Sequence, residues 1–333
     1  MGRFERLGVK LNGRAMTQAN DGMDLYGKVV TVLGGSGFFG EHVAQELLGR
    51  GARIRIASRN PEKAYQIKPL GNLGQTQFVR CDVTRPESVA AAVRGADAVV
   101  NLVGAFTGNL DAIQGRGAGR IAEAVKEAGA TSFLHVSANG ADAQSEVAYA
   151  RTKGEGEIAV RDAFPGATIF RPSILFGSDD SFVMMFAGLI STFPILPVFG
   201  PDARLQPVFV DDAAEAIGNA LARPAEHGGE TYEICGPEVL TMLDLNERIA
   251  KAQARKRHFL PLPDAVSSAV AAVPGTPITS DQWALLEKGN VATGDYPGME
   301  ALGIAPRPLG LFLDRWMVRF RKHGRFTESA DAR

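Results

Sequence analysis

A short glycine-rich segment, GGSGFFG, constrains the fold of this 333-residue chain more than any other feature. It follows the β-branched run Val29–Leu33, precedes a helix-length segment at 39–48, and satisfies both GxGxxG and GxxGxxG. Glycine permits a positive φ in the tight turn, and its missing Cβ lets backbone amides approach a phosphate. The pattern predicts the phosphate loop of a dinucleotide-binding Rossmann unit, made by Gly34, Gly35, Ser36, Gly37, Phe38, Phe39 and Gly40. A glycine-rich turn that binds no ligand is the alternative.

The order of the remaining segments predicts an α/β fold with a Rossmann-type doubly wound parallel sheet, because short β-branched runs alternate with helix-length segments. Strands are expected at 29–33, 53–57, 77–80, 98–102, 133–136 and 168–171, and helices at 39–48, 61–67, 86–93, 111–128 and 149–164. Right-handed crossovers would place the ligand crevice beyond the carboxyl ends of the strands.

After about Gly177 the alternation becomes irregular, with helices expected at 211–221 and 243–254. We therefore expect a Rossmann NADP(H)-binding domain over 26–176 and a smaller C-terminal substrate lobe over 177–333. Some segments of that lobe, about 206–222, would return to the Rossmann domain. Residues 1–25 read as a disordered lead-in without an assigned function.

Composition narrows the class of protein. A net charge of -1 with 45% hydrophobic residues describes a globular protein without a field that attracts nucleic acid. The two cysteines, Cys81 and Cys235, are far apart, and the five histidines lack metal-ligand spacing, so neither a disulfide framework nor a metal site is expected. Residues 1–25 lack a continuous apolar segment, which argues against a secretory signal and favours the cytoplasm.

The residues that follow the second expected strand bear on the choice of cofactor. An NAD-preferring site usually carries an acidic residue there, whereas this chain has Ser58 and Arg59. A guanidinium and a hydroxyl suit a 2′-phosphate, so NADP(H) is favoured over NAD(H). NAD(H) stays open, because Arg59 could be a solvated loop cation.

Two further strand ends give weaker signals for the same cofactor. Asp82 and Val83 follow the third strand, where an adenine amino group would lie, although Asp82 could equally be a helix N-cap. Asn101, Leu102, Val103 and Gly104 end the fourth strand, where the backbone must pass close to a ribose.

A serine, a tyrosine and a lysine form the candidate catalytic group. Tyr149 and Lys153 are spaced i and i+4, so they share one helix face, and Ser137 ends the fifth strand. The ammonium of Lys153 is expected to lower the pKa of Tyr149 toward working pH. Tyr149 could then exchange a proton with a carbonyl or alcohol held by Ser137, while hydride moves to or from the nicotinamide.

Together these residues resemble the short-chain dehydrogenase/reductase superfamily, in its extended or atypical branch, also called the NAD-dependent epimerase/dehydratase family. Four further segments sharpen the resemblance: YARTKGEGEIAVRDAF at 149–164, RPSILF at 171–176, QPVFVDD at 206–212 and GMEALGI at 298–304. They are similar to the NADPH-binding accessory subunits of respiratory complex I and their bacterial relatives, from about Lys28 to the C-terminus.

The resemblance implies a tightly held NADPH contacted by the residues that match the family motif: Gly34, Gly37, Gly40, Arg59 and Lys153, with Pro172 and Ile174 near the nicotinamide. In the complex I subunit the nucleotide is regarded as structural, whereas related atypical members are linked to quinone metabolism. Ser137, Tyr149 and Lys153 are all present here, so the chain departs from a plainly inactive site.

Two regions suggest partners. The apolar run 182–199 reads as a buried helix and apolar loop that could wall a hydrophobic small molecule, with Arg204 as a nearby candidate for an anionic group. Near the end, an apolar helical face is surrounded by basic residues, which suits an anionic membrane surface on the inner side or docking on complex I subunits. Packing of this helix on its own domain is the alternative. The apolar positions are Leu309, Phe312, Leu313, Trp316 and Phe320.

The sequence leaves three functions open. The first is an NADPH-dependent oxidoreductase that reduces a hydrophobic carbonyl or quinone-like substrate, with Tyr149 as proton donor. The second is a non-catalytic NADPH-binding accessory or assembly protein related to complex I. The third is a nucleotide-sugar epimerase or dehydratase, which the absence of basic groups in the run 182–199 disfavours.

Overall fold

A computed structural model describes residues 24–271 and 280–326 of the chain. Most of the expected lead-in, up to residue 23, lies outside the described residues. Leu25 is already buried in the core, so the folded unit includes a residue that we assigned to the lead-in.

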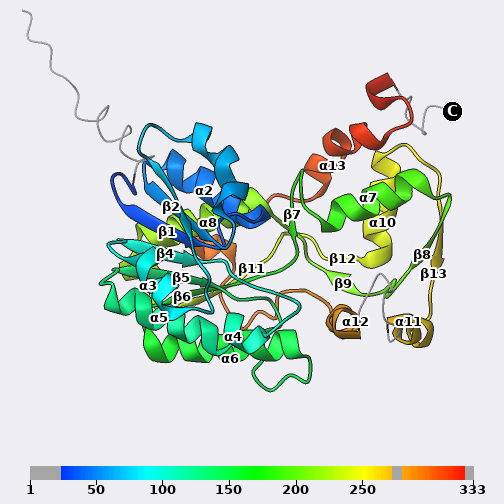
Figure 1. Ribbon diagram of the computed structural model, residues 1–333. Helices are drawn as coiled ribbons and strands as arrows, with labels where there is room; N and C mark the ends of the chain where they lie inside the picture. The colour runs from blue at the N-terminus through cyan, green and yellow to red at the C-terminus, as the bar shows by residue number, and fades with distance from the viewer. Residues whose placement is uncertain (1–23, 272–279, 327–333) are drawn as a thin grey trace, which may run out of the picture.

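A parallel seven-stranded sheet forms the centre of the larger part of the molecule, with the strand order β11-β6-β5-β4-β1-β2-β3 (Figure 1). This arrangement confirms the predicted Rossmann-type α/β fold. The strands are β1 (Val29–Leu33), β2 (Arg53–Ser58), β3 (Thr76–Arg80), β4 (Ala98–Asn101), β5 (Ser132–Val136), β6 (Thr168–Pro172) and β11 (Thr231–Ile234).

Helices cover both faces of this sheet (Figure 1). On one face α2 and α8 bury aliphatic side chains such as Leu47 and Ile217, and on the other α3, α5 and α6 bury Val89, Ile121 and Val160. The bounds are α2 (Phe38–Gly49), α3 (Pro86–Val93), α4 (Leu110–Ile113), α5 (Arg116–Glu127), α6 (Ala148–Ala163) and α8 (Val210–Ala222), with a 3-10 helix η1 (Pro61–Leu70) in place of the helix expected at 61–67.

The single helix expected over 111–128 is wrong, because the chain breaks between α4 and α5. A Cβ on Gly117 would lie 2.1 Å from the carbonyl oxygen of Ala112, and one on Gly156 of α6 would lie 2.1 Å from that of Gln114. The break lets Gln114 turn inward, where its side chain donates to Thr152 Oγ1 and accepts from the amide of Ala105. It thereby ties α6 to the loop after β4.

The smaller part of the molecule has its own core, built around α7, α10 and α13 (Figure 1). Three two-stranded pairings, β7 with β10, β9 with β12 and β8 with β13, hold its loops. The bounds are β7 (Leu175–Phe176), α7 (Phe182–Thr192), β8 (Ile195–Val198), β9 (Arg204–Leu205), β10 (Val208–Phe209), β12 (Leu240–Thr241), α10 (Met242–Ala252), β13 (His258–Pro261), α11 (Asp264–Ala271), α12 (Ser280–Lys288), α13 (Gly310–Trp316), η3 (Met317–Phe320) and η4 (Gly324–Phe326). Two short elements of the later chain, α9 (Pro224–His227) and η2 (Met299–Leu302), pack on the larger part instead.

Two expectations about this smaller lobe need correction. The run 182–199 is a buried helix on one side only, since Val183 and Ile190 are buried while Leu189 and Phe193 are exposed. Its second half forms the strand β8 instead of a loop.

The C-terminal helix packs on its own lobe, which was the alternative interpretation of its apolar face. Leu309 and Leu313 are buried, and the Phe312 ring stacks on Phe209 with centroids 4.1 Å apart. That face is therefore covered by protein. Among the described residues, no helix has the length and apolar character needed to cross a membrane.

Candidate functional site

The glycine loop connects β1 to α2 at the carboxyl edge of the sheet. Gly34 has a φ of +81°, which a side chain would strain, and a Cβ on Gly40 would lie 2.5 Å from the Cα of Gly35. Gly37 is the N-cap of α2 and offers no side chain to cap it. The first amides of α2 can therefore donate to an anionic group, as a dinucleotide phosphate requires.

The end of β2 lies beside this loop. Ser58 has a buried hydroxyl with no hydrogen-bond partner among the described residues, and Arg59, next to it, is exposed. An unpartnered buried hydroxyl is costly unless a ligand satisfies it. The two residues supply a hydroxyl and a cation next to the glycine loop, which are groups that can hold a ribose or a phosphate.

Asp82 follows β3, and hydrogen bonds within the turn that it begins hold its carboxylate in place. Its carboxylate accepts from the amide of Thr84 at 3.0 Å and from the hydroxyl of Thr84 at 2.7 Å. These bonds, followed by smaller effects that include the charge of Arg59, lower the pKa of Asp82. Helix α3 is capped at Arg85, so the N-cap role considered for Asp82 is wrong. Val83, beside it, packs at the margin of the core under α3.

The end of β4 brings backbone close to the lysine of the candidate catalytic group. A Cβ on Gly104 would lie 3.2 Å from Lys153 Nζ, so a larger residue there would displace the ammonium. The amide of Val103 donates to Asn101 Oδ1, and the amide of Leu102 donates to the carbonyl of Leu33 at the start of the glycine loop. The structure thus places these strand ends and the glycine loop side by side.

Lys153 is buried, and its ammonium donates to the carbonyl oxygen of Val136 at 3.1 Å. Burial lowers the pKa of Lys153 to about 8, against the opposing charge of Glu157. Val136 directly precedes Ser137, so the ammonium lies at the end of β5. Ser137 has a buried hydroxyl without a hydrogen-bond partner in the part of the chain that is described.

Tyr149 lies in the first turn of α6, and its surroundings differ from what we expected. Burial raises the pKa of Tyr149 to about 12, and within residues 24–271 and 280–326 no hydrogen bond joins its hydroxyl to Ser137 or Lys153. The expected lowering of this pKa by Lys153 is therefore wrong for the chain alone. The ring of Tyr149 instead stacks on Phe106, from the loop after β4, with centroids 4.4 Å apart.

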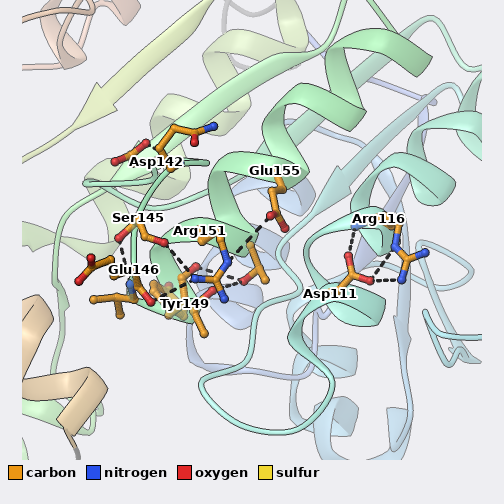
Figure 2. A network of polar contacts seen from close by, with 12 residues as sticks. Asp111, Arg116, Asp142, Ser145, Glu146, Tyr149, Arg151 and Glu155 are labelled. Carbon is orange, nitrogen blue, oxygen red and sulfur yellow. Dashed lines mark hydrogen bonds and ion pairs between the residues drawn. The ribbon is translucent and has the colours of Figure 1, made fainter.

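The loop that leads into Tyr149 is held from both lobes, and Figure 2 shows the contacts around its labelled residues. Arg151 donates to the carbonyl oxygens of Ser145 and Glu146, at 3.0 and 3.1 Å. Lys288 of α12 reaches Ser145 Oγ at 3.5 Å. The loop before Tyr149 therefore contacts the smaller lobe.

Pro172 and Ile174 lie where β6 leaves the sheet. Pro172 pairs with Ile234 of β11, and the amide of Ile174 donates to Asn290 Oδ1 at 2.9 Å. Arg204 is exposed, and its carbonyl accepts from the amide of Asn290. Asn290 therefore links this strand end to the smaller lobe.

A buried pair that the sequence analysis missed lies beside Lys153. The side-chain nitrogen Nδ2 of Asn101 lies 3.0 Å from Nδ1 of His135, and Nε2 of His135 has no partner among the described residues. Burial, helped by the charge of Lys153, lowers the pKa of His135 to about 3, so the ring is neutral. A polar residue in each of two otherwise apolar strands was the available signal.

Comparison with known proteins now adds to this geometry. The model of an NAD(P)H-binding family matches residues 34–180. The rat mitochondrial NADH dehydrogenase [ubiquinone] 1 alpha subcomplex subunit 9 is 34% identical over 86% of this chain and 78% of its own length. The chain belongs to the family of this subunit. It thus carries the nicotinamide-dinucleotide-binding domain that the glycine loop predicted.

Two other proteins that are similar to this chain, one in sequence and one in structure, are a reductase and an oxidoreductase by name. The ceramide reductase of Caulobacter vibrioides is 30% identical over 57% of this chain and 59% of its own length. An NADPH-dependent quinone oxidoreductase from Escherichia coli, solved with NADPH, superposes with a TM-score of 0.69 at 18% identity, over 86% of this chain and 99% of that one. The structural likeness shows the shared fold.

Proposed function

We propose that this protein is an NADP(H)-dependent oxidoreductase that reduces a hydrophobic carbonyl or quinone-like substrate. The observation that carries the proposal is a pair of buried hydroxyls that have no hydrogen-bond partner among residues 24–271 and 280–326: Ser58 at the end of β2 and Ser137 directly after β5. We propose that the first binds the nucleotide ribose and that the second binds the substrate oxygen. Ser137 directly follows Val136, whose carbonyl accepts from Lys153, and a tyrosine with a lysine is suited to proton transfer.

In this proposal the chain holds the cofactor along the carboxyl edge of the sheet. The loop from Gly34 to Gly40 binds the pyrophosphate, and Ser58 with Arg59 binds the 2′-phosphate, which gives the preference for NADP(H). Asp82 and Val83 border the adenine, and Lys153 binds the nicotinamide ribose. The remaining proposed contacts, to the nicotinamide half, come from Leu102, Val103, Gly104, Pro172 and Ile174.

The chemistry needs one hydride and one proton. A nicotinamide, when bound, would supply the hydride. Tyr149 gives its hydroxyl proton to the substrate oxygen, which Ser137 holds by a hydrogen bond. Tyr149 is protonated at neutral pH, but burial raises its pKa to about 12, so this pKa must fall toward working pH for efficient proton transfer. Once Lys153 turns from Val136 toward the ribose, its ammonium stabilises the tyrosinate that remains.

We propose that the smaller lobe, from 177 onward, supplies the substrate wall. Two observations support this role of the smaller lobe. The run 182–199 has no charged residue, and Lys288 contacts the loop before Tyr149. Lobe movement would then change the access of a substrate to Tyr149.

The test is consumption of NADPH by the purified protein with panels of quinones and of aliphatic and aromatic carbonyl compounds. We expect turnover that Tyr149→Phe abolishes while NADPH binding is retained. Absence of turnover with every panel compound, in a protein that binds NADPH, would overturn the catalytic proposal and leave the binding proposal intact.

A second candidate is a non-catalytic NADPH-binding accessory protein of a respiratory complex. The contact of Lys153 with Val136 and the raised pKa of Tyr149 favour it, because both leave the catalytic group unready in the chain alone. Membership in the complex I subunit family supports the same candidate. Retention of NADPH without turnover, with co-purification of complex I subunits from the native source, would decide for this candidate.

A further inference from the structure

The smaller lobe carries a second candidate site, a surface of exposed apolar side chains with a basic border. The stretch from Ser181 to Gly200, which contains α7 and β8, has no charged residue. One side of α7 packs on the core through Val183 and Ile190. Its other side exposes Met185 and Leu189, by 48% and 39%, where a solvent-facing helix normally carries charges.

The exposed apolar side continues beyond the helix. Phe193, one turn after Leu189, is 51% exposed, and Ile195 of β8 is 61% exposed. In the parallel pairing of β8 with β13, Pro197 lies opposite Leu260, which is 56% exposed. We call Met185, Leu189, Phe193, Ile195 and Leu260 the α7–β8 face. Single exposed apolar residues are ordinary, but a continuous row of them marks an interaction surface.

Two strongly basic segments meet beside this face. Residues 251–258 and 315–325 together carry nine lysines and arginines and no aspartate or glutamate, in a chain whose net charge is -1. Arg255 donates to the carbonyl of Phe320, and Arg321 donates to that of Ala252, both at 2.9 Å, so the segments lie side by side. The cations are Lys251, Arg255, Lys256, Arg257, Arg315, Arg319, Arg321, Lys322 and Arg325.

The basic segments border α7 at both of its ends. Arg257 donates to the carbonyl of Ile190 at 2.6 Å, near the end of the helix. Arg319 reaches the sulfur of Met184 and the carbonyl of Ser178, both at 2.7 Å, near its start. The cations thus flank the apolar row instead of lying on another side of the lobe.

We propose that the α7–β8 face and its basic border bind the surface of a lipid bilayer that contains anionic lipids. The apolar side chains would enter the boundary between headgroups and acyl chains, and the cations would lie over the phosphates. A second copy of this chain fits less well, because a two-fold contact would bring two basic borders together. The proposal differs from attachment through the apolar face of α13, which is covered by protein.

The test uses the full chain, loaded with NADPH, in flotation with phosphatidylcholine vesicles and with vesicles of equal parts phosphatidylcholine and phosphatidylglycerol. We expect binding to the anionic vesicles that weakens at high salt, and little binding to the neutral ones. Absence of binding to both kinds of vesicle would overturn the proposal, as would equal binding to both. Capture of an acidic protein partner without vesicle binding would overturn it in favour of a protein interface.

Two pairs of variants separate the charge from the apolar face. Lys256→Gln with Lys322→Gln should weaken binding to anionic vesicles about thirtyfold, since each cation near the surface contributes roughly fivefold. Leu189→Ser with Phe193→Ser should also weaken binding but leave its dependence on salt unchanged. The matched control, Lys28→Gln with Lys126→Gln, removes two exposed lysines of the larger lobe and should leave binding unchanged.

All these variants are expected to retain NADPH binding, which serves as the check that they fold. Equal losses in the control and in the Lys256 and Lys322 variant would overturn the proposal by showing that only total charge matters. Because vesicle binding is measured without turnover, its outcome is independent of whether the oxidoreductase proposal holds.

Discussion

The glycine loop and the group of Ser137, Tyr149 and Lys153 occupy the same edge of the sheet, but they are preformed to different degrees. In the loop, backbone geometry alone sets the site, as the contact a Cβ on Gly40 would make with Gly35 shows. In the catalytic group, the Lys153 ammonium donates to Val136, and Tyr149 stacks on Phe106. Dinucleotide binding is therefore built into the backbone, whereas proton transfer depends on side chains that a ligand must rearrange.

Tyr149→Phe tests whether proton transfer depends on this side chain while NADPH binding does not. If Tyr149 gives the proton, turnover should fall by about 10²–10⁴-fold, while the affinity for NADPH stays unchanged. Steady-state kinetics and a nucleotide titration measure the two effects. Tyr26→Phe, at a strongly exposed tyrosine, is the control that should alter neither. Unchanged turnover in Tyr149→Phe would remove this residue from the mechanism.

The pH dependence of stability tests how deeply Lys153 is buried. Its pKa falls from 10.5 to about 8 on folding, so between these values the unfolded chain keeps a proton that the folded chain has released. The free energy of unfolding should therefore rise with pH in this window, by at most about 1.4 kcal/mol per pH unit. Below pH 8 both states hold the proton, and the full cost of burying the charge is present.

Lys153→Met should remove this rise, whereas Lys126→Met on the exposed side of α5 should keep it. Urea unfolding near pH 8 and near pH 10 measures the difference. The raised pKa of Tyr149 acts in the opposite direction, but only between about 10 and about 12. An equal dependence of the unfolding free energy on pH in the wild type and in Lys153→Met would show that the lysine is hydrated.

Gly40→Ala tests whether the backbone geometry of the glycine loop sets the cofactor site. The new Cβ would lie 2.5 Å from the Cα of Gly35, so the backbone must move, at a cost of about 1–3 kcal/mol in stability, and NADPH binding should weaken. Gly49→Ala, at the end of the same helix, meets no atom within 4 Å and is the control. Equal NADPH affinity in both variants would contradict a phosphate loop at this position.

Arg59→Ala sharpens the cofactor assignment. Loss of a hydrogen-bonded charge on the 2′-phosphate should weaken NADPH binding roughly tenfold and leave NADH binding unchanged. Fluorescence titration with the two nucleotides measures both constants. Arg53→Ala, at an exposed arginine of the opposite end of β2, provides the comparison. An equal loss of affinity for NADPH and for NADH would mean that Arg59 does not contact the 2′-phosphate.

Phe106→Ala should have the smallest effect. Removing the stacked ring costs about 0.5–1.5 kcal/mol and exposes Tyr149, so the pKa of Tyr149 should move down toward its ordinary value of 10. Ultraviolet titration of tyrosinate, compared with Tyr149→Phe, isolates this group. A pKa that stays near 12 would show that other neighbours cause the burial.

The sequence predicted those parts of the molecule that depend on local geometry. The glycine loop and the spacing of Tyr149 and Lys153 along α6 are set within a few residues of chain, and the periodic pattern identified six of the seven strands. The strand β11 escaped prediction because Glu233 interrupts its apolar pattern. In the fold that carboxylate is satisfied by Thr293 and by the amide of Gly294, some 60 residues away.

The features that the sequence did not predict depend on contacts between distant segments. The break between α4 and α5 follows from the close approach of Gln114 to Gly156 of another helix. The raised pKa of Tyr149 follows from burial, and its stacking partner Phe106 comes from the loop after β4. Residue type and spacing predicted which residues form the catalytic group, but they could not predict how the side chains of that group are oriented.

A calorimetric titration of the wild-type protein with NADPH and with NADH tests the proposed cofactor site. With Ser58 and Arg59 beside the glycine loop, we expect NADPH to bind at least about tenfold more tightly than NADH. Equal binding of the two nucleotides, or tighter binding of NADH, would contradict this expectation.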